Sequence, residues 1–531
     1  MTAATEILDL VVRGGTLVDG AGGPERLCDV GIVGERIVAV AAELDQGART
    51  VLDATGLVVC PGFVDIHTHS DLTLLSSPQA SSALTQGTTT QVVGNCGLGV
   101  APRSADADLH AIRASAAYLD LDPDVVIDWT TVGGYLDTLR AAAPAVNVLT
   151  LVPHGPLRAS TVGFEARPAA PRELAAMLDL LADGLDDGAV GLSTGLVYAP
   201  LCFAEEDELV ALGRVVADYD RLFAWHVRDY ADDLLPSVAQ CLRVARETGC
   251  RTQVSHLVAV GRRNWGRVED ALALVDEARG EGLDVGVDIY PYLAGNAPLA
   301  QAVPPQMQAG GDDAMRQRLY EPDAVRVLMQ EWASRAVGWD ETVVSWLPDP
   351  QESELLGRTV TDIAGARGES PDATALELLR RYGSRALVVV FGRDPRDLDR
   401  VLRHPATVVA SDGLALDPTG PTGRGTPHPR CYGCFPRYLS SRGRADLPDA
   451  VRRCTSAPAR RVGLTDRGTL EVGAVADLLV IDPATLRDTA TFESPHQLSV
   501  GVREVLVSGR RAVQDGRLTG VRAGAVVALG G

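Results

Sequence analysis

The chain has 531 residues, more than one hydrophobic core normally serves, so we expect a large catalytic domain and a smaller second unit. Hydrophobic residues make up 46% and charged residues 22%, as in ordinary globular enzymes, and the formal charge of −21 argues against nucleic acid or an anionic membrane surface as a partner. No apolar run reaches the length of a membrane span, the start lacks the features of a signal peptide, and the nine scattered cysteines are typical of reduced thiols, so we expect a cytoplasmic protein.

Both ends of the chain are predicted to form short β-strands. Residues 6–57 alternate β-branched runs with Gly and Asp turns, and the stretch from about 466 onwards has the same texture. We therefore expect residues 1–60 and 466–531 to combine in one small β-sandwich. This unit would flank a catalytic domain at 61–465 and would not itself hold the chemistry.

The middle of the chain alternates strand-like and helix-like segments, which is typical of an α/β fold with a parallel sheet. The eight predicted strands lie within 58–71, 88–97, 146–154, 188–198, 222–228, 252–256, 284–290 and 407–412. With helices between them, for example at 170–187 and 232–249, they predict a (β/α)8 TIM barrel, whose active site lies at the C-terminal ends of the strands. The stretch from about 293 to 405 is too long for one crossover. It is predicted to be an insertion over the barrel mouth, with helices at 322–338 and 371–383 and an extra strand from Leu387.

The first of these strands carries the most informative motif. It runs as an apolar stretch from Val58, breaks at Pro61-Gly62, and presents His67 and His69. Side chains two residues apart on a strand point to the same face, so both imidazoles face one point. Such a pair is half of a metal site, whereas the alternative is a strand end with two solvent-facing histidines.

Further metal-capable side chains end the later strands. Cys96 follows the second strand, His226 the fifth, His256 the sixth and Asp412 the last, and His154 also ends a strand. Each one alone has an ordinary structural explanation, but together they would gather at one rim of a barrel. Imidazole, thiolate and carboxylate ligands suit zinc better than magnesium or calcium. Two metals that share a bridging ligand would lie roughly 3.5–4 Å apart.

The chain contains no lysine, which excludes Schiff-base chemistry, a lysine general base and a lysine-derived metal bridge. The set of strand-end residues resembles the amidohydrolase superfamily, many binuclear members of which bridge their metals with a carboxylated lysine. It is most similar to the N-acyl-D-amino-acid deacylases (D-aminoacylases), in which a cysteine after strand two takes that place. The resemblance runs from about residue 9 to 510. It is carried by the stretches 87–97, 191–198, 288–292, 410–413, 428–437 and 455–459.

This resemblance implies zinc as the cofactor, with one tightly bound ion and a second, weaker position. The ligands implied for the tight zinc are Cys96, His226 and His256. Those implied for the second position are His67, His69 and Asp412. The resemblance also implies that Asp412 takes the proton from the attacking water and passes it to the leaving amine.

The resemblance implies a substrate-binding role for several other residues. Arg430 matches the arginine that clasps the substrate carboxylate, a task suited to a planar guanidinium. Tyr198 and Tyr290 match tyrosines that contact the substrate or polarise the scissile carbonyl, although both would serve equally well as barrel packing.

Three features depart from the family pattern. Val258 stands where many relatives have lysine, and Asn296 stands where a carboxylate-binding serine is usual. The loop between Asp412 and Arg430 (413–429), which contains the stretch 418–427, is longer and richer in Gly and Pro than expected. We expect all three to border the pocket, with Asn296 in contact with the substrate. A C-x-x-C at Cys431 and Cys434 has no second pair, so it is not predicted to be a structural zinc or redox centre.

The sequence thus predicts zinc-dependent hydrolysis of the amide bond of an N-acyl-D-amino acid, a small-molecule substrate, giving a carboxylate and a free D-amino acid. The preference for the D-isomer comes from the resemblance alone. One alternative is ring opening of a cyclic amide, as in hydantoinases and dihydroorotases, and another is a metal-free scaffold protein on the same barrel. The acyl group, the amino-acid side chain, the number of occupied metal positions and the oligomeric state are left open.

Overall fold

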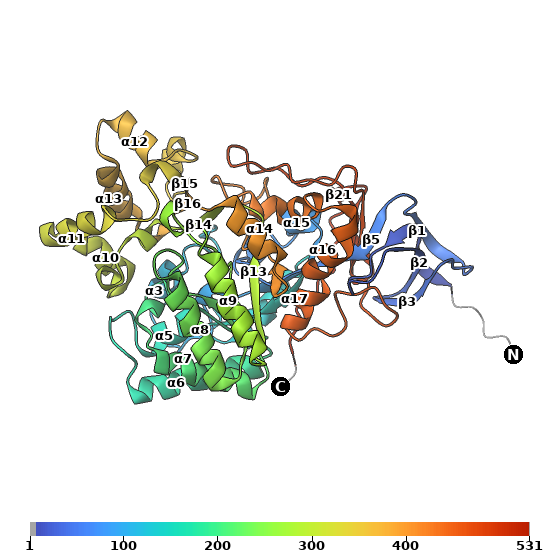
Figure 1. The fold of residues 1–531 in the computed structure, drawn as a ribbon, viewed down its shortest axis with the longest axis horizontal. Helices are drawn as coiled ribbons and strands as arrows, with labels where there is room; N and C mark the ends of the chain where they lie inside the picture. The colour runs from blue at the N-terminus through green and yellow to red at the C-terminus, as the bar shows by residue number, and fades with distance from the viewer. Residues whose placement is uncertain (1–6, 530–531) are drawn as a thin grey trace.

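The computed structural model describes residues 7–529. Residues 1–6 and 530–531, which belong to the two predicted terminal β segments, lie outside the described residues. The fold is mixed α/β: β-strands near the N-terminus lie at one end of the molecule, strands and helices form its body, and a helical unit lies at the other end (Figure 1). Within residues 7–529, every helix is either too short or too polar to cross a bilayer.

Strands from both ends of the chain share one nine-stranded sheet. Its strands are β1 (Leu8–Leu17), β2 (Arg26–Val33), β3 (Arg36–Ala41), β4 (Ala48–Asp53), β5 (Val58–Pro61), β18 (Leu478–Ile481), β19 (Val502–Val507), β20 (Arg510–Gln514) and β21 (Arg517–Leu518). The junction is β5, which runs parallel to β1 and antiparallel to β18, with Cys60 opposite Leu479. Both ends therefore contribute strands to one sheet. The sandwich layering and the domain limits stay predictions.

The body contains two parallel sheets, in the orders β6-β7-β8 and β17-β13-β12-β11-β10-β9. Their strands are β6 (Phe63–Asp65), β7 (Thr88–Val93), β8 (Asn147–Thr150), β9 (Val152–Pro153), β10 (Gly191–Gly195), β11 (Leu222–His226), β12 (Arg251–Val254), β13 (Val285–Ile289) and β17 (Thr407–Val409). Nearly every residue of these strands is buried, as expected for parallel strands covered on both faces. Only Leu151 separates β8 from β9. At the other edge, Thr68 and Gly413 form a parallel bridge.

Amphipathic helices follow most of the parallel strands. The predicted helices at 170–187 and 232–249 are α6 (Pro171–Asp186) and α8 (Leu234–Thr248), and Gly249 ends α8 with a φ of 72° that suits glycine. The others along the body are α1 (Thr73–Ser76), α2 (Ser81–Thr85), α3 (Leu109–Ser115), α4 (Val132–Ala142), α5 (His154–Thr161), α7 (Glu206–Asp218), α9 (Val268–Gly280), α14 (Pro395–Arg403), α15 (Arg430–Ser440), α16 (Leu447–Cys454) and α17 (Ser456–Arg461).

The predicted insertion is a unit with its own small sheet and its own hydrophobic core. Its elements are β14 (Ala294–Pro298), α10 (Gly311–Arg318), α11 (Pro322–Trp332), β15 (Thr342–Trp346), α12 (Val360–Arg367), α13 (Pro371–Tyr382) and β16 (Leu387–Phe391). The predicted strand from Leu387 is confirmed as β16. The helix expected at 322–338 is shorter, because the chain leaves it after Trp332 and returns to pack Trp339 against that ring, 5.0 Å between centroids.

Candidate metal centre and substrate pocket

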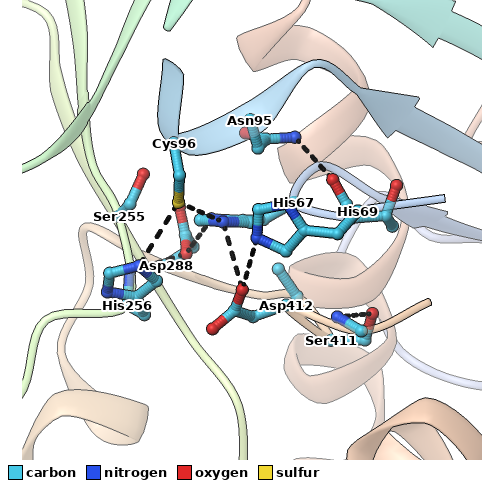
Figure 2. A network of polar contacts seen from close by, with 12 residues as sticks. His67, His69, Asn95, Cys96, Ser255, His256, Asp288, Ser411 and Asp412 are labelled. Atoms are coloured by element: carbon cyan, nitrogen blue, oxygen red, sulfur yellow. Dashed lines mark hydrogen bonds and ion pairs between the residues drawn. The ribbon is translucent and has the colours of Figure 1, made fainter. Parts of the chain in front are cut away.

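The six side chains predicted as metal ligands meet at the C-terminal ends of the parallel strands. His67 and His69 follow β6, Cys96 follows β7, His256 follows β12 and Asp412 follows β17 (Figure 2). His226 ends β11. They form three groups of three whose ligand atoms lie within 4.8 Å of one another. The groups are His67–His69–Cys96, Cys96–His226–His256 and His67–His256–Asp412. His67, Cys96 and His256 each belong to two groups, and Cys96 is the one of these three whose side chain can supply an anion to bridge two metals.

Three of these residues have a left-handed backbone. The φ angles of Cys96, His256 and Asp412 are 56°, 33° and 50°. This conformation costs a non-glycine residue about 1–2 kcal/mol, and it persists where surrounding contacts enforce it. Here the backbone N–H of His256 donates to Asp288 Oδ1 at 2.8 Å, and that of Asp412 donates to the carbonyl of His67 at 2.8 Å. These contacts hold the three residues in a strained backbone conformation, and this conformation directs their side chains toward one point.

The donor set fits a zinc ion. Cys96 Sγ lies 3.6 Å from His256 Nε2 and 3.2 Å from His67 Nε2. Tetrahedral zinc would separate a sulfur and a nitrogen ligand by about 3.6 Å. Burial lowers the pKa of His226 to about 3, so its imidazole is neutral, which is the form that binds metals. Burial raises the pKa of the Cys96 thiol, so a nearby cation is needed to hold it as a thiolate.

Asp288 orients two of the candidate ligands, and the sequence prediction missed it. Its Oδ1 accepts hydrogen bonds from His67 Nδ1 at 3.1 Å and from the backbone N–H of His256, and its Oδ2 accepts one from Gln253 Nε2 at 3.0 Å. A carboxylate on Nδ1 leaves Nε2 of the imidazole to face the metal. The available signal was a carboxylate within β13, a strand whose other residues are apolar or glycine and which is buried throughout.

Asp412 and Arg430 form a buried ion pair beside the centre. Arg430 Nη1 lies 2.7 Å from Asp412 Oδ2, and His69 Nε2 lies 2.9 Å from Asp412 Oδ1. Burial opposes ionisation of Asp412, but the positive charge of Arg430 and the neighbouring histidines together outweigh it and hold the pKa of Asp412 well below the usual range. Arg430 is only 1% exposed, and it also donates to the hydroxyl of Tyr118 at 3.0 Å.

A cavity of about 250 Å³ opens above the centre. Its lining includes all the candidate ligands except His67, together with Tyr198, Tyr290, Val258 and Asn296, as predicted for the last two. Arg430 is not among the lining residues; its Cζ lies 4.4 Å from the Tyr290 ring. Arg393, which the sequence prediction missed, does line the cavity.

The expectation that the loop at 418–427 borders the pocket is wrong. None of its residues lines the cavity. The loop instead contacts β15 and the residue after α1. The backbone N–H of Thr426 donates to Ser345 O at 2.8 Å, and the Thr422 hydroxyl lies 3.0 Å from that of Ser77. These contacts link residues far apart in sequence, which composition alone does not reveal.

Three other histidine and cysteine residues lie outside the candidate metal centre: His154, Cys431 and Cys434. His154 begins α5 and is buried, with Nε2 2.9 Å from Glu208 Oε1. Cys431 and Cys434 are free thiols in α15, and the thiol of Cys434 donates to Ala410 O at 3.3 Å. Within residues 7–529, none of them joins a possible metal-binding group.

Comparison with known proteins agrees with this geometry. The sequence model of the amidohydrolase family matches residues 50–340 and 379–513, which is most of the chain. The chain belongs to the amidohydrolase family. The predicted resemblance is thereby confirmed at the level of the family.

This amidohydrolase has relatives along its whole length. It is 36% identical over 525 residues to the D-aminoacylase of Alcaligenes xylosoxydans xylosoxydans, covering 98% of this chain and 97% of that one. It is 37% identical over 509 residues to the N-acyl-D-glutamate deacylase of the same organism, covering 95% and 93%. Its fold matches the N-acyl-D-glutamate deacylase of Bordetella bronchiseptica, solved with zinc and a phosphonate inhibitor, with a TM-score of 0.82, 34% identity and coverage of 98% and 100%.

Proposed function

We propose that this chain is a zinc-dependent amidohydrolase that cleaves the amide bond of N-acyl-D-amino acids, releasing a carboxylate and a free D-amino acid. The observation that carries the proposal is Cys96, which among the described residues is the one shared by two possible metal-binding groups that can supply an anion. In a chain without lysine, this thiolate supplies the bridging anion that a carboxylated lysine supplies in many ring-opening relatives. Similarity along the full length to a D-aminoacylase and an N-acyl-D-glutamate deacylase supports the substrate class.

The residues around the cavity provide the groups that the reaction needs. Bound zinc would supply Lewis-acid polarisation and make water a better nucleophile. As the water oxygen attacks the acyl carbon, Asp412 accepts its proton and then delivers it to the nitrogen of the breaking C–N bond. The ion pair with Arg430 keeps Asp412 ionised and oriented for this transfer.

Two further groups would act on the substrate. Tyr290 Oη accepts a hydrogen bond from Arg393 Nη2 at 2.6 Å, so its own O–H stays available to donate to the developing oxyanion. Tyr198, whose ring lies 5.0 Å from the His226 ring, is a second cavity-wall tyrosine suited to that task. Arg430 is proposed to bind the α-carboxylate as a second anionic partner, because its guanidinium lies 2.7 Å from Asp412 and its Cζ lies 4.4 Å from the Tyr290 ring, beside the groups that act on the scissile amide.

We also infer that the two parallel sheets form one closed (β/α)8 barrel. The near continuity of β8 and β9 supports closure on one side. The bridge between Thr68 and Gly413 supports it on the other, together with the hydrogen bond from the N–H of His69 to Gly413 O at 2.8 Å. The domain limits 1–60, 61–465 and 466–531 are proposed with it, as is the layering of the terminal β unit.

A substrate panel tests the function directly. The purified enzyme should hydrolyse N-acetyl-D-amino acids and leave the L-isomers intact, lose activity on chelation, and regain it when zinc is added. Cyclic amides such as dihydropyrimidines serve as the comparison set. Turnover of the cyclic amides alone would favour the ring-opening alternative, and absence of both bound zinc and turnover would favour the scaffold.

A further inference from the structure

The wall of the cavity carries one arginine, and the inserted unit supplies it. Asn296 and Ala297 on β14, Val390 on β16 and Arg393 just beyond β16 line the cavity from this unit. Val258, on the barrel side, is apolar. The chain has no lysine, so Arg393 is the only lysine or arginine among the described residues that line the cavity.

The charge of Arg393 has no counter-ion in the part of the chain that the structure describes. Its guanidinium donates to Tyr290 Oη at 2.6 Å and to Tyr292 O at 3.5 Å, while no carboxylate of residues 7–529 forms an ion pair with it. A guanidinium has five N–H donors, so several remain for a ligand. Asp229 also lines the cavity, but its carboxylate accepts hydrogen bonds from the backbone N–H of Ala231 and Asp233 at 2.9 and 2.7 Å. The Asp229 carboxylate is therefore hydrogen-bonded to the backbone of its own loop and does not pair with Arg393.

The neighbouring strand is shaped to receive this arginine. A Cβ at Gly295 would lie 2.7 Å from Arg393 Nη2, so a side chain there would displace the guanidinium. Next to it, Asn296 accepts a hydrogen bond from Ser345 Oγ at 3.2 Å through its Oδ1. The amide NH2 of Asn296 is thus left as a donor at the cavity wall. The pairing of β14 with β16 holds Gly295 and Asn296 in register with Val390 and Val389.

The two arginines lie close to the same aromatic ring. The Cζ atoms of Arg430 and Arg393 are 4.4 and 4.8 Å from the Tyr290 ring. Arg430 is neutralised by Asp412, whereas Arg393 is half-buried and unpaired. An apolar substrate side chain packed over Arg393 would remove its unpaired positive charge from water, and this desolvation is unfavourable in free energy. A carboxylate would instead make a strong, charge-assisted pair with it.

We propose that Arg393 and Asn296 form a subsite for a second carboxylate, carried by the side chain of the substrate, so that the enzyme prefers N-acyl derivatives of acidic D-amino acids. This inference rests on the proposed function and adds the class of side chain. It makes Arg393 a specificity-determining residue contributed by the inserted unit. Identities of 36% and 37% to a D-aminoacylase and an N-acyl-D-glutamate deacylase do not distinguish the side-chain classes.

The test compares an acid with its closest neutral analogue. We would measure kcat/KM of the zinc-loaded enzyme for N-acetyl-D-glutamate, N-acetyl-D-glutamine and N-acetyl-D-leucine, in wild type and in Arg393→Met. Wild type should favour glutamate over glutamine by about 10- to 100-fold, which is the range expected when a hydrogen bond to a charged group is replaced by a neutral one. Arg393→Met should abolish or reverse that preference. Arg393→Lys should keep part of it, since the charge stays but the planar fork is lost.

A matched control separates the local effect from the change of net charge. Arg262, whose side chain is 73% exposed and paired with Glu341 at 3.0 Å, lies outside the cavity lining. Arg262→Met makes the same change of net charge and should leave the glutamate-to-glutamine ratio unchanged. Melting temperatures of all variants check that each one folds.

The outcomes are distinct. If wild type does not distinguish glutamate from glutamine, or if Arg393→Met lowers kcat/KM equally for all three substrates, the subsite is refuted. An equal loss would show that Arg393 acts on a group common to all three substrates, either the α-carboxylate or, through the hydroxyl of Tyr290, the scissile carbonyl. If wild type hydrolyses none of the three but opens cyclic amides, the proposed function itself fails.

Discussion

Replacing Asp288 by asparagine probes how the centre is held together. Asp288 touches no proposed metal position, yet its carboxylate accepts hydrogen bonds from the ring of His67, the backbone of His256 and the amide of Gln253. Asparagine has nearly the same shape but lacks the negative charge, and one of its two terminal atoms is a donor. The substitution should therefore weaken metal binding without removing a ligand.

The size of the effect follows from these contacts. The asparagine oxygen can still accept from His67 and His256, but as a neutral acceptor, and hydrogen bonds to charged groups contribute about 1.5–3 kcal/mol against about 0.5–1.5 for neutral ones. Its NH2 group would face the NH2 of Gln253, whose Oε1 is already held by Arg461 Nε at 3.1 Å. Loss of a carboxylate behind a metal-binding histidine typically costs about 10- to 100-fold in metal affinity, or about 1.4–2.7 kcal/mol. We expect Asp288→Asn to fall in this range.

The measurement is a competition titration of the metal-free protein with zinc and a chromogenic chelator at fixed pH. The control is Asp276→Asn, the same chemical change at a carboxylate 62% exposed on α9, where it pairs with His404. Circular dichroism and thermal melting establish that both variants are folded. Metal-free protein is used so that the affinity is read separately from turnover.

A zinc affinity for Asp288→Asn within about threefold of wild type, and equal to that of Asp276→Asn, would refute this reasoning, since an orienting carboxylate is expected to matter more. The hydrogen bonds of Asp288 would then serve the fold of β13 alone. A folded variant with weaker zinc binding and normal stability would support the orienting role.

The remaining predictions concern single groups of the centre. Cys96→Ala should lose the tight zinc and the activity, whereas Cys431→Ser should keep both, as read by metal analysis; full zinc content in the first variant would remove Cys96 from the ligand set. Asp412→Asn should keep the fold and the tight zinc but lower kcat about 10²- to 10⁴-fold, and a loss below roughly tenfold would assign proton transfer to another group. Arg430→Lys should raise KM for an N-acyl-D-amino acid more than for its α-amide, which lacks the carboxylate; equal increases would contradict the carboxylate contact. Burial raises the pKa of Asp65 to about 7, so the folded state keeps a proton that the unfolded chain releases above about pH 4, and stability falls as pH rises between these values. Asp65→Asn should therefore gain stability relative to wild type across that window, measured by urea unfolding of chelator-treated protein, and a difference independent of pH would contradict the shifted pKa.

Much of the centre could be predicted from local patterns. His67 and His69 share a face because side chains alternate along a strand, and that parity is a property of the strand itself. The C-terminal ends of parallel strands meet at one edge, so Cys96, His256 and Asp412 could be placed together from strand order alone. The absence of lysine is likewise read directly from the sequence, and it directed attention to the thiol.

Tertiary structure decided which polar groups support or surround these residues. His154 ends a predicted strand, as His226 does, yet its Nε2 lies 2.9 Å from Glu208 Oε1 and it belongs to none of the possible metal-binding groups within residues 7–529. The direction of such a side chain depends on packing rather than on its position in a strand. Asp288 gained its role only when β13 came to lie beside β12. Arg393 lies about a hundred residues from Tyr290 in sequence, and only the pairing of β14 with β16 places its charge at the cavity wall. Such contacts are long-range, and a single sequence carries no local signal for them because they depend on how distant elements pack.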